Sequence, residues 1–172
     1  AARWPAEPES PAEVSVEALA SALKMMCGLW MPKERPTRYA EWILQHSEHF
    51  GVDPLLVAGL VISRSQCRPK HKSAHGLGLS QIHDKMHWRH LRDRVYHYWV
   101  FEEGAWAERK LDLSEYQFTR HMLKAAAANI YFTAGLLRVA MDQCPHNDGA
   151  FGSVAHRHPV SHFIWGDRVR GT

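Results

Sequence analysis

The chain has 172 residues, 45% of them hydrophobic, which is enough to build one globular domain and excludes a disordered or fibrous protein. Its 21 Lys and Arg residues nearly balance its 18 Asp and Glu residues, so we expect no nucleic-acid partner. The 13 His and 7 Trp residues stand out, because both types recognise carbohydrates and protein partners as well as filling ordinary cores.

Residues 1–13 are rich in Pro, Ala and Glu and lack periodicity, so we expect an extended leader there and a folded domain over residues 14–172. The apolar stretches are shorter than a bilayer-spanning helix, which predicts a protein that is not membrane-spanning. No signal peptide is visible, and the first residue is Ala1 rather than Met, so we interpret the chain as a mature or truncated product.

The first half of the chain predicts three helices. Apolar residues at near-helical spacing indicate one over residues 16–30. A second covers residues 36–50, with Gly51 as a left-handed C-terminal residue. The third begins with Asp53 as N-cap and Pro54 in its first turn. Because this third helix is apolar nearly all round, we expect it to be the central buried one.

The second half begins with a loop over residues 67–81 that is rich in Gly, Ser and Lys. We predict a helix over residues 84–100, where the aromatic density leaves a strand as the alternative, and a long helix over residues 114–143. A short helix over residues 159–169 ends the chain. Any strands would be too short for a substantial sheet, so the predicted fold class is mainly α.

Cys27, Cys67 and Cys144 allow at most one internal disulfide and leave one thiol over. Three buried, reduced cysteines are the alternative. The cysteines alone therefore do not identify the redox compartment.

Four segments occur in a fixed order along the chain: FGVDPLLVAGLVISRSQCRP, SAHGLGLSQI, NIYFTAGLLRVAMDQ, and HNDGAFGSV followed by WGDRV. Together they resemble the transglycosylase domain of soluble lytic transglycosylases, which is related to goose-type lysozymes. The resemblance covers roughly residues 38–170, and the chain is longer than the family's usual connection between Gln81 and Asn129. It implies a lysozyme-like α fold whose cleft binds alternating N-acetylglucosamine and N-acetylmuramic acid.

In that family a Glu at the end of the third helix serves as both acid and base, and here the matching residue is Arg64. Guanidinium has no acceptor lone pair and stays protonated up to about pH 12, so it cannot replace a general acid. Arg64 could instead pair with a carboxylate of a muramyl group or stem peptide. The alternative is an internal ion pair with Asp148 or Glu48.

The resemblance implies a set of glycan-binding residues and no catalytic one: Arg64, Ser65, Gly78, Leu79, Gln81, Asn147 and Trp165. The amides of Gln81 and Asn147 suit hydroxyl and N-acetyl groups, but they could equally pin their loops to the backbone. Trp165 could stack on a sugar ring or fill the core.

A relocated acid is one alternative, with Glu48, Asp84, Glu102 and Glu103 as candidates, although none lies at a position that the family uses. Side-chain carboxyls near a cleft are common and are mostly solvated.

A zinc site is a second alternative, because His83, His87 and His90 would share one face of a helix and His71 and His75 lie in the preceding loop. No carboxylate or cysteine pattern completes a known zinc signature. We therefore expect neither a metal nor another cofactor.

The favoured hypothesis is a degenerate, inactive lytic transglycosylase-like domain that binds peptidoglycan glycan strands or acts as a scaffold, with an envelope protein as a further partner. Its expected location is exported, either periplasmic or in the cell envelope. The alternatives are an active enzyme with a relocated acid and a protein-interaction domain with a blocked cleft.

Overall fold

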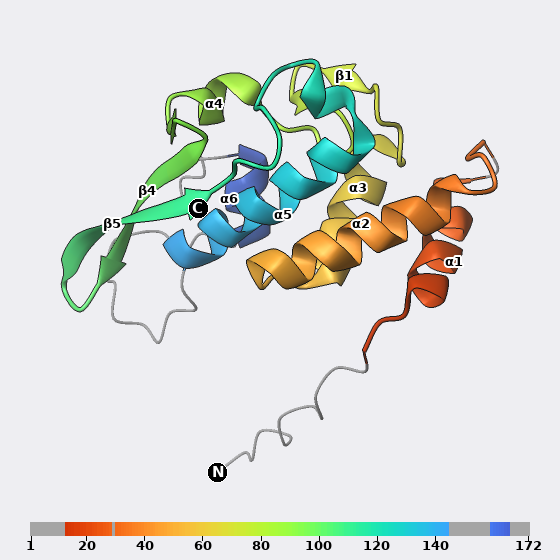
Figure 1. Cartoon of the computed structure of the whole chain (residues 1–172), viewed down its shortest axis with the longest axis horizontal. Coiled ribbons are helices and arrows are strands. Elements are labelled where there is room, and N and C mark those ends of the chain that lie inside the picture. The colour runs from red at the N-terminus through yellow and green to blue at the C-terminus, as the bar shows by residue number, and fades with distance from the viewer. Residues whose placement is uncertain (1–12, 29, 145–158, 166–172) are drawn as a thin grey trace, which may run out of the picture.

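The computed structural model of the chain describes residues 13–28, 30–144 and 159–165. Of these residues, 53% are helical and 17% lie in strands, so helices dominate as predicted but two small sheets accompany them (Figure 1). The elements are α1 (Val16–Cys27), α2 (Arg35–Phe50), α3 (Pro54–Ser65), β1 (Lys72–Ser73), β2 (Gly76–Leu77), α4 (Asp84–Trp88), β3 (Leu91–Arg92), β4 (Val95–Glu102), β5 (Ala105–Asp112), the 3₁₀ helix η1 (Met122–Lys124), α5 (Ala126–Gln143) and α6 (Pro159–Trp165).

The first three helices begin and end close to their predicted bounds because local signals set them. The Asp53 carboxylate accepts a hydrogen bond from the Leu55 amide at 2.8 Å, and Pro54 occupies the first turn of α3. Gly51 ends α2 in the left-handed region with φ of 63°. In α1 the Ser15 side chain caps the N-terminus, and the helix ends at Cys27, short of the predicted residue 30.

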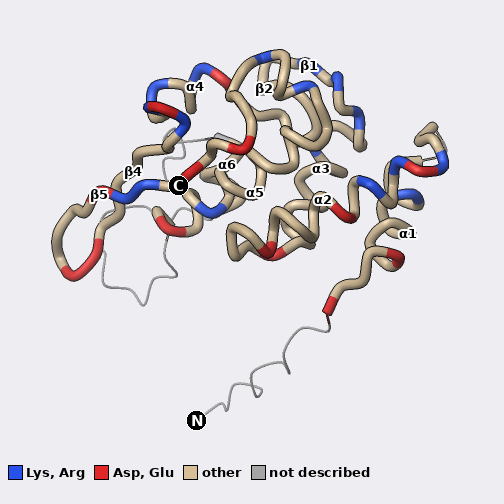
Figure 2. The backbone as a smooth tube through the Cα atoms, in the orientation of Figure 1, with Lys and Arg blue, Asp and Glu red and all other residues tan. Residues whose placement is uncertain are grey.

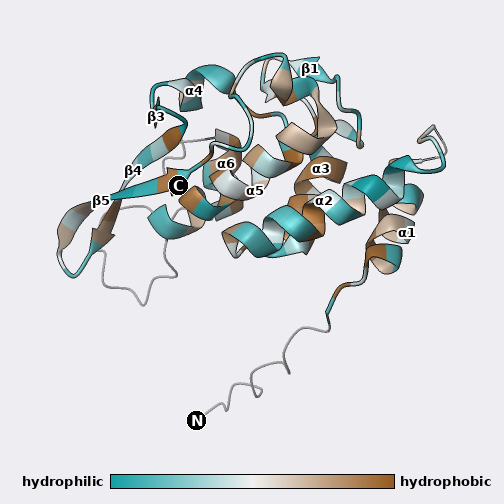
Figure 3. Ribbon diagram, in the orientation of Figure 1, coloured by the Kyte–Doolittle hydropathy of each residue, from teal (hydrophilic) through white to brown (hydrophobic). Residues whose placement is uncertain are grey.

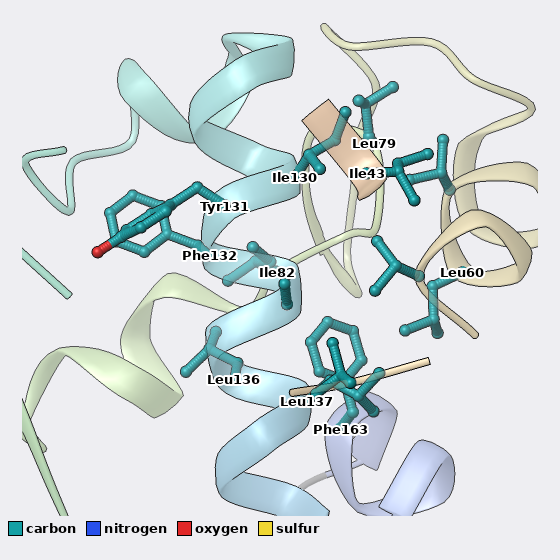
Figure 4. Close-up of a cluster of buried hydrophobic side chains, with 14 of the residues drawn as sticks. Ile43, Leu60, Leu79, Ile82, Ile130, Tyr131, Phe132, Leu136, Leu137 and Phe163 are labelled. Atoms are coloured by element: carbon teal, nitrogen blue, oxygen red, sulfur yellow. The ribbon is translucent and has the colours of Figure 1, made fainter. Parts of the chain in front are cut away.

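The central buried helix is α5, and the prediction that α3 takes this place is wrong. In α5, 12 of the 18 residues are buried, and α2, α3, α6 and β4 all pack against it (Figure 4). Figure 3 colours much of α3 as hydrophobic, yet Leu55 on that helix is 55% exposed. Some of the apolar residues of α3 are therefore exposed to solvent, so its apolar sequence overstates how deeply the helix is buried.

The predicted helix over residues 84–100 is also wrong, because only α4 is helical there. Strands β3, β4 and β5 form an antiparallel sheet, and the eight-residue strands β4 and β5 contradict the expectation that strands are too short for a sheet. Burial alternates along β4: Tyr96, Tyr98 and Val100 are buried, whereas the residues between them are more exposed. Period-two burial against α5 therefore favours the strand.

The turn between β4 and β5 and a hydrogen bond to α5 hold this hairpin in place. Glu103 and Gly104 both have positive φ, 49° and 81°, which fits a two-residue turn that follows the twist of the strands. On the buried face, the Tyr98 hydroxyl donates to Asp142 of α5 at 2.6 Å. Burial and this carboxylate raise the pKa of Tyr98 above its usual range, so the hydroxyl stays protonated as the donor.

The predicted helix over residues 114–143 is correct only from Ala126 onward. Phe118 and Leu123 are both buried, and a helix would turn two residues at this spacing onto different faces. The chain instead runs as an irregular segment followed by η1. Ser114 is not the helix cap: its amide donates to the Asp112 carboxylate at 2.8 Å. The predicted last helix is observed as α6, and residues 166–169 lie outside the described part.

A disulfide joins Cys27, at the end of α1, to Cys67, just after α3. Of the two possibilities left open by the sequence, one disulfide or three reduced cysteines, the structure shows the disulfide. Cys144 is buried, and its Sγ lies 3.2 Å from Nδ1 of His162. No helix in the described part of the chain is both long and apolar enough to cross a bilayer.

Candidate glycan-binding site

Arg64 lies in the last turn of α3, where a cation interacts favourably with the helix dipole. It is partly buried, and its Nε atom is enclosed without a hydrogen-bond partner. Within the described residues it forms no ion pair, so the alternative of an internal pair with Glu48 receives no support. Asp148, the other suggested partner, lies outside the described residues.

The chain turns sharply directly after Arg64. The Ser65 hydroxyl donates to the Val61 carbonyl at 3.1 Å and accepts from the Arg68 amide at 3.2 Å. Gln66 and Cys67 follow with φ of 51° and 62°, and their amides bond back to the last carbonyls of α3. Ser65 is buried and engaged in this turn, so its contacts support a structural role.

Gly78 and Leu79 hold the loop after β2 against the core. Gly78 has φ of 78°, and a Cβ at this position would overlap the Leu123 carbonyl and the Asn129 side chain. Leu79 is fully buried. Glycine is therefore required here because the backbone closely approaches η1 and the Asn129 side chain of α5, and neither residue presents a side chain to a ligand.

The Gln81 side chain uses its hydrogen-bonding capacity inside the protein. Its Nε2 donates to the Gly78 carbonyl at 2.9 Å and to the His71 carbonyl at 3.1 Å, while its Oε1 accepts from the Ser73 hydroxyl at 2.6 Å. Gln81 is buried. Of the two sequence interpretations, these contacts favour loop pinning over direct sugar recognition.

Asn129 on α5 connects the second and third motif segments. Its Nδ2 donates to the carbonyls of Leu77 and Leu123, at 3.1 and 2.8 Å. Its Oδ1 accepts from both the amide and the hydroxyl of Ser80, each at 3.1 Å. Asn129 is completely buried and all four contacts are made, which makes it the residue that joins the loop to the central helix.

Sequence reasoning matches Asn129 to the third motif but assigns it no role. The residues next to Asn129 in the sequence do not predict its contact with Ser80, because Ser80 lies 49 residues earlier in the chain. The Ser80 hydroxyl also lies 2.5 Å from that of Thr133 one turn further along α5, which completes a fully satisfied polar cluster.

Two of the implied glycan-binding residues cannot be placed beside Arg64. Asn147 lies outside the described residues. Trp165 ends α6, and its side chain also lies outside the described part.

The candidate relocated acids do not gather at the end of α3. Glu102 pairs with Arg109 at 2.6 Å, and Asp84 pairs with Arg120 at 2.7 Å. Glu102 and Glu103 lie at the tip of the β4–β5 hairpin, which Figure 1 shows at the left edge of the molecule, away from α3. In the described part of the chain, no hydrogen bond or ion pair joins either acid to α3.

Among the described residues, the carboxyls of Glu108 and Asp112 have displaced pKa values, and both are displaced downward. A hydrogen bond from the His97 ring lowers the pKa of Glu108. Hydrogen bonds from Ser114 lower that of Asp112. A general acid needs the opposite displacement to stay protonated near neutral pH, so neither carboxyl suits that role.

The histidines of the zinc alternative do not share one helical face. Helix α4 ends at Trp88, before His90, and the Nδ1 atom of His87 lies 2.8 Å from the Tyr96 hydroxyl. His90 packs against the Tyr96 ring. Within the described part, no three His, Cys, Asp or Glu side chains lie close enough together to hold a metal ion.

No family model, curated protein or solved structure matches the chain. The function is therefore inferred from the residues and their contacts. A pocket of about 410 Å³ lies between α4, β3 and residues 113–119, and Arg64 does not line it.

Proposed function

We propose that the chain is a degenerate lytic transglycosylase-like module with a lysozyme-like fold, which binds peptidoglycan glycan strands and does not cleave them. The observation that carries the proposal is Arg64: the motif position of the family's acid holds a permanent cation that has no ion-pair partner among the described residues.

The assembly of the motif segments supports the fold part of the proposal. Segments that are far apart in sequence meet through Asn129, which bonds to Leu77 and Ser80 of the Gly-rich loop. The same loop is held from its other side by Gln81. This polar cluster needs residues from both motif segments. Such a cluster is expected if the two segments come from one family of folded domains, whereas neither segment alone would require it.

The chemistry of Arg64 supports the absence of cleavage. The glycosidic oxygen needs a proton donor with a pKa near the working pH, and guanidinium releases its proton only above about pH 12. The same group suits forked hydrogen bonding to carboxylates, which muramyl lactyl groups and stem peptides carry. Arg64 is therefore suited to binding an anionic part of the glycan and unsuited to acid catalysis.

The disulfide supports the proposed location. Disulfides persist in oxidising compartments and are rare in reducing ones, so the bond between Cys27 and Cys67 fits an exported protein of the periplasm or cell envelope.

Co-sedimentation with purified peptidoglycan sacculi tests the binding. We expect the wild-type protein to sediment with sacculi and Arg64→Ala to do so about tenfold more weakly, since a charged hydrogen bond contributes roughly 1.5 kcal/mol or more. Arg89→Ala removes an exposed charge of the same type from the residue after α4 and serves as the control for a change in net charge. Sedimentation that Arg64→Ala leaves unchanged would refute the role of Arg64.

One observation favours a protein-interaction domain as a second candidate function. Trp99 and Trp106 on the β4–β5 hairpin are 55% and 64% exposed, and aromatic rings are enriched at protein interfaces. The hairpin lies in the segment where the chain is longer than the family it resembles. Failure to bind sacculi, together with capture of a specific envelope protein that Trp106→Ser abolishes, would favour this function instead.

A further inference from the structure

An exposed apolar cluster lies where α1 ends. Met25, Met26 and Trp30 are 78%, 61% and 40% exposed, and we call them the Met–Trp patch. The Trp30 ring lies close to the end of α1, since a Cβ at Gly28 would be 3.7 Å from it. Long apolar side chains gathered on a surface commonly mark an interaction site.

Cations adjoin the patch on the side of α2. The Arg35 guanidinium lies over the Trp30 ring, 5.7 Å from its centroid. Lys24, Lys33 and Arg38 are exposed and form no ion pair with any described acid. Figure 2 shows mostly blue segments where α2 begins. Glu34 is the only acid between residues 18 and 40.

The disulfide adds a second group of cations to the same end of the molecule. It brings Cys67 within 5.7 Å of Cys27, measured between Cα atoms, and Arg68 and Lys70 follow directly. Both are exposed, and residues 54–83 contain no Asp or Glu at all. The segment between α3 and β1 accordingly carries blue stretches and no red in Figure 2.

We infer that this end of the molecule docks on the surface of an anionic lipid bilayer, with the Met–Trp patch entering the boundary between headgroups and acyl chains and the surrounding Lys and Arg residues contacting the headgroups. Methionine side chains gain by leaving water for hydrocarbon, and Trp settles at the headgroup level. Each cation near a negatively charged surface strengthens binding about fivefold. A purely polyanionic partner would leave the two methionines in water, so the combination favours lipid.

This inference is independent of the proposed glycan binding, because it rests on the ends of α1 and α3 and on the start of α2. A module that holds glycan strands and also rests on a membrane surface would position the cell wall near the bilayer. Failure of vesicle binding would leave the glycan proposal untouched.

Sedimentation with lipid vesicles tests the inference with the whole chain. We expect binding to vesicles of phosphatidylglycerol and phosphatidylcholine that falls as salt rises, and little binding to phosphatidylcholine alone. Replacing Met25→Ser and Met26→Ser together should weaken binding at least about tenfold. The matched control, Trp99→Ser with Trp106→Ser, removes two apolar side chains from the hairpin that are also more than half exposed and should leave binding unchanged.

The charge contribution has its own pair of variants. Lys33→Glu with Arg38→Glu should weaken binding to anionic vesicles about tenfold or more, whereas Arg92→Glu with Lys110→Glu changes the net charge equally on the hairpin sheet and should have a much smaller effect. Circular dichroism confirms that each variant is folded. The inference would be overturned if the protein bound neutral and anionic vesicles equally well, or if the methionine double variant bound like the wild type. An equal loss of binding in a patch variant and in its control variant would overturn it too, as would binding to a DNA duplex without binding to vesicles.

Discussion

Replacing Asn129→Ala tests the polar cluster that joins the Gly-rich loop to α5. The substitution leaves the Leu123 carbonyl and the Ser80 amide without their partner in a fully buried site, whereas the Leu77 carbonyl still accepts from the Ile82 amide. A buried polar group without a partner costs about 1–3 kcal/mol, so the two groups together predict a loss of about 3 kcal/mol in the free energy of unfolding. The Ser80 hydroxyl keeps its contact with Thr133, so it adds little to this sum.

Urea denaturation followed by circular dichroism measures this loss. Gln45→Ala is the matched control, because Gln45 carries the same amide on the exposed side of a helix, and its loss should change stability by less than about 0.5 kcal/mol. A loss below about 1 kcal/mol for Asn129→Ala would show that the cluster does not hold the loop. Such a result would also remove the main structural support for relating the two motif segments.

Three further predictions concern stability. Gly78→Ala should cost more than about 3 kcal/mol in thermal or chemical denaturation, since its Cβ would overlap backbone that cannot move away; a near-neutral result would show that the loop can shift. Replacing Cys27→Ala with Cys67→Ala opens a bridge with a sequence separation of 40, which predicts a loss of about 4 kcal/mol, and reduction of the wild-type protein should match it. Burial lowers the pKa of His46 from its ordinary 6.5, so the unfolded chain takes up a proton more readily than the folded chain and stability should fall as the pH drops below 6.5; His46→Gln should flatten this dependence, and exposed His121→Gln should not.

Local signals explain which elements could be predicted. The end of α2 and the start of α3 follow from Gly51, Asp53 and Pro54, whose effects depend only on their immediate neighbours. The β4 strand could not be assigned in this way, because its alternating burial exists only once α5 covers one face. The choice between α3 and α5 as the central helix likewise depended on neighbours, since both are apolar.

The sequence predicts which residues lie in the candidate site better than it predicts what each of their side chains contacts. The position of Arg64 at the end of α3 follows from the motif register and is what the structure shows. The contacts of Gln81 and Asn129 depend on groups that are distant in sequence, so an amide that could bind a sugar cannot be distinguished beforehand from one that pins a loop. Pairing of Cys27 with Cys67 required the packing of α1 against α3.

The histidine pattern shows the same limit. His83, His87 and His90 have a spacing that suits a metal only if one helix carries them all. Helix α4 ends at Trp88 instead, and the Tyr96 side chain contacts both His87 and His90. The contacts with Tyr96 on β4 therefore determine where His87 and His90 lie, and their spacing along the chain does not.

We propose that Arg64, at the motif position where lytic transglycosylases carry their acid, leaves the chain unable to cleave glycan strands. Incubating the wild-type protein with sacculi and analysing the soluble fraction by mass spectrometry tests this proposal directly. We predict no anhydromuropeptides above a buffer control, under conditions where an active lytic transglycosylase releases them. Release of anhydromuropeptides by the wild-type protein, abolished by replacing Glu102 and Glu103 with Gln, would contradict the claim and identify a relocated acid.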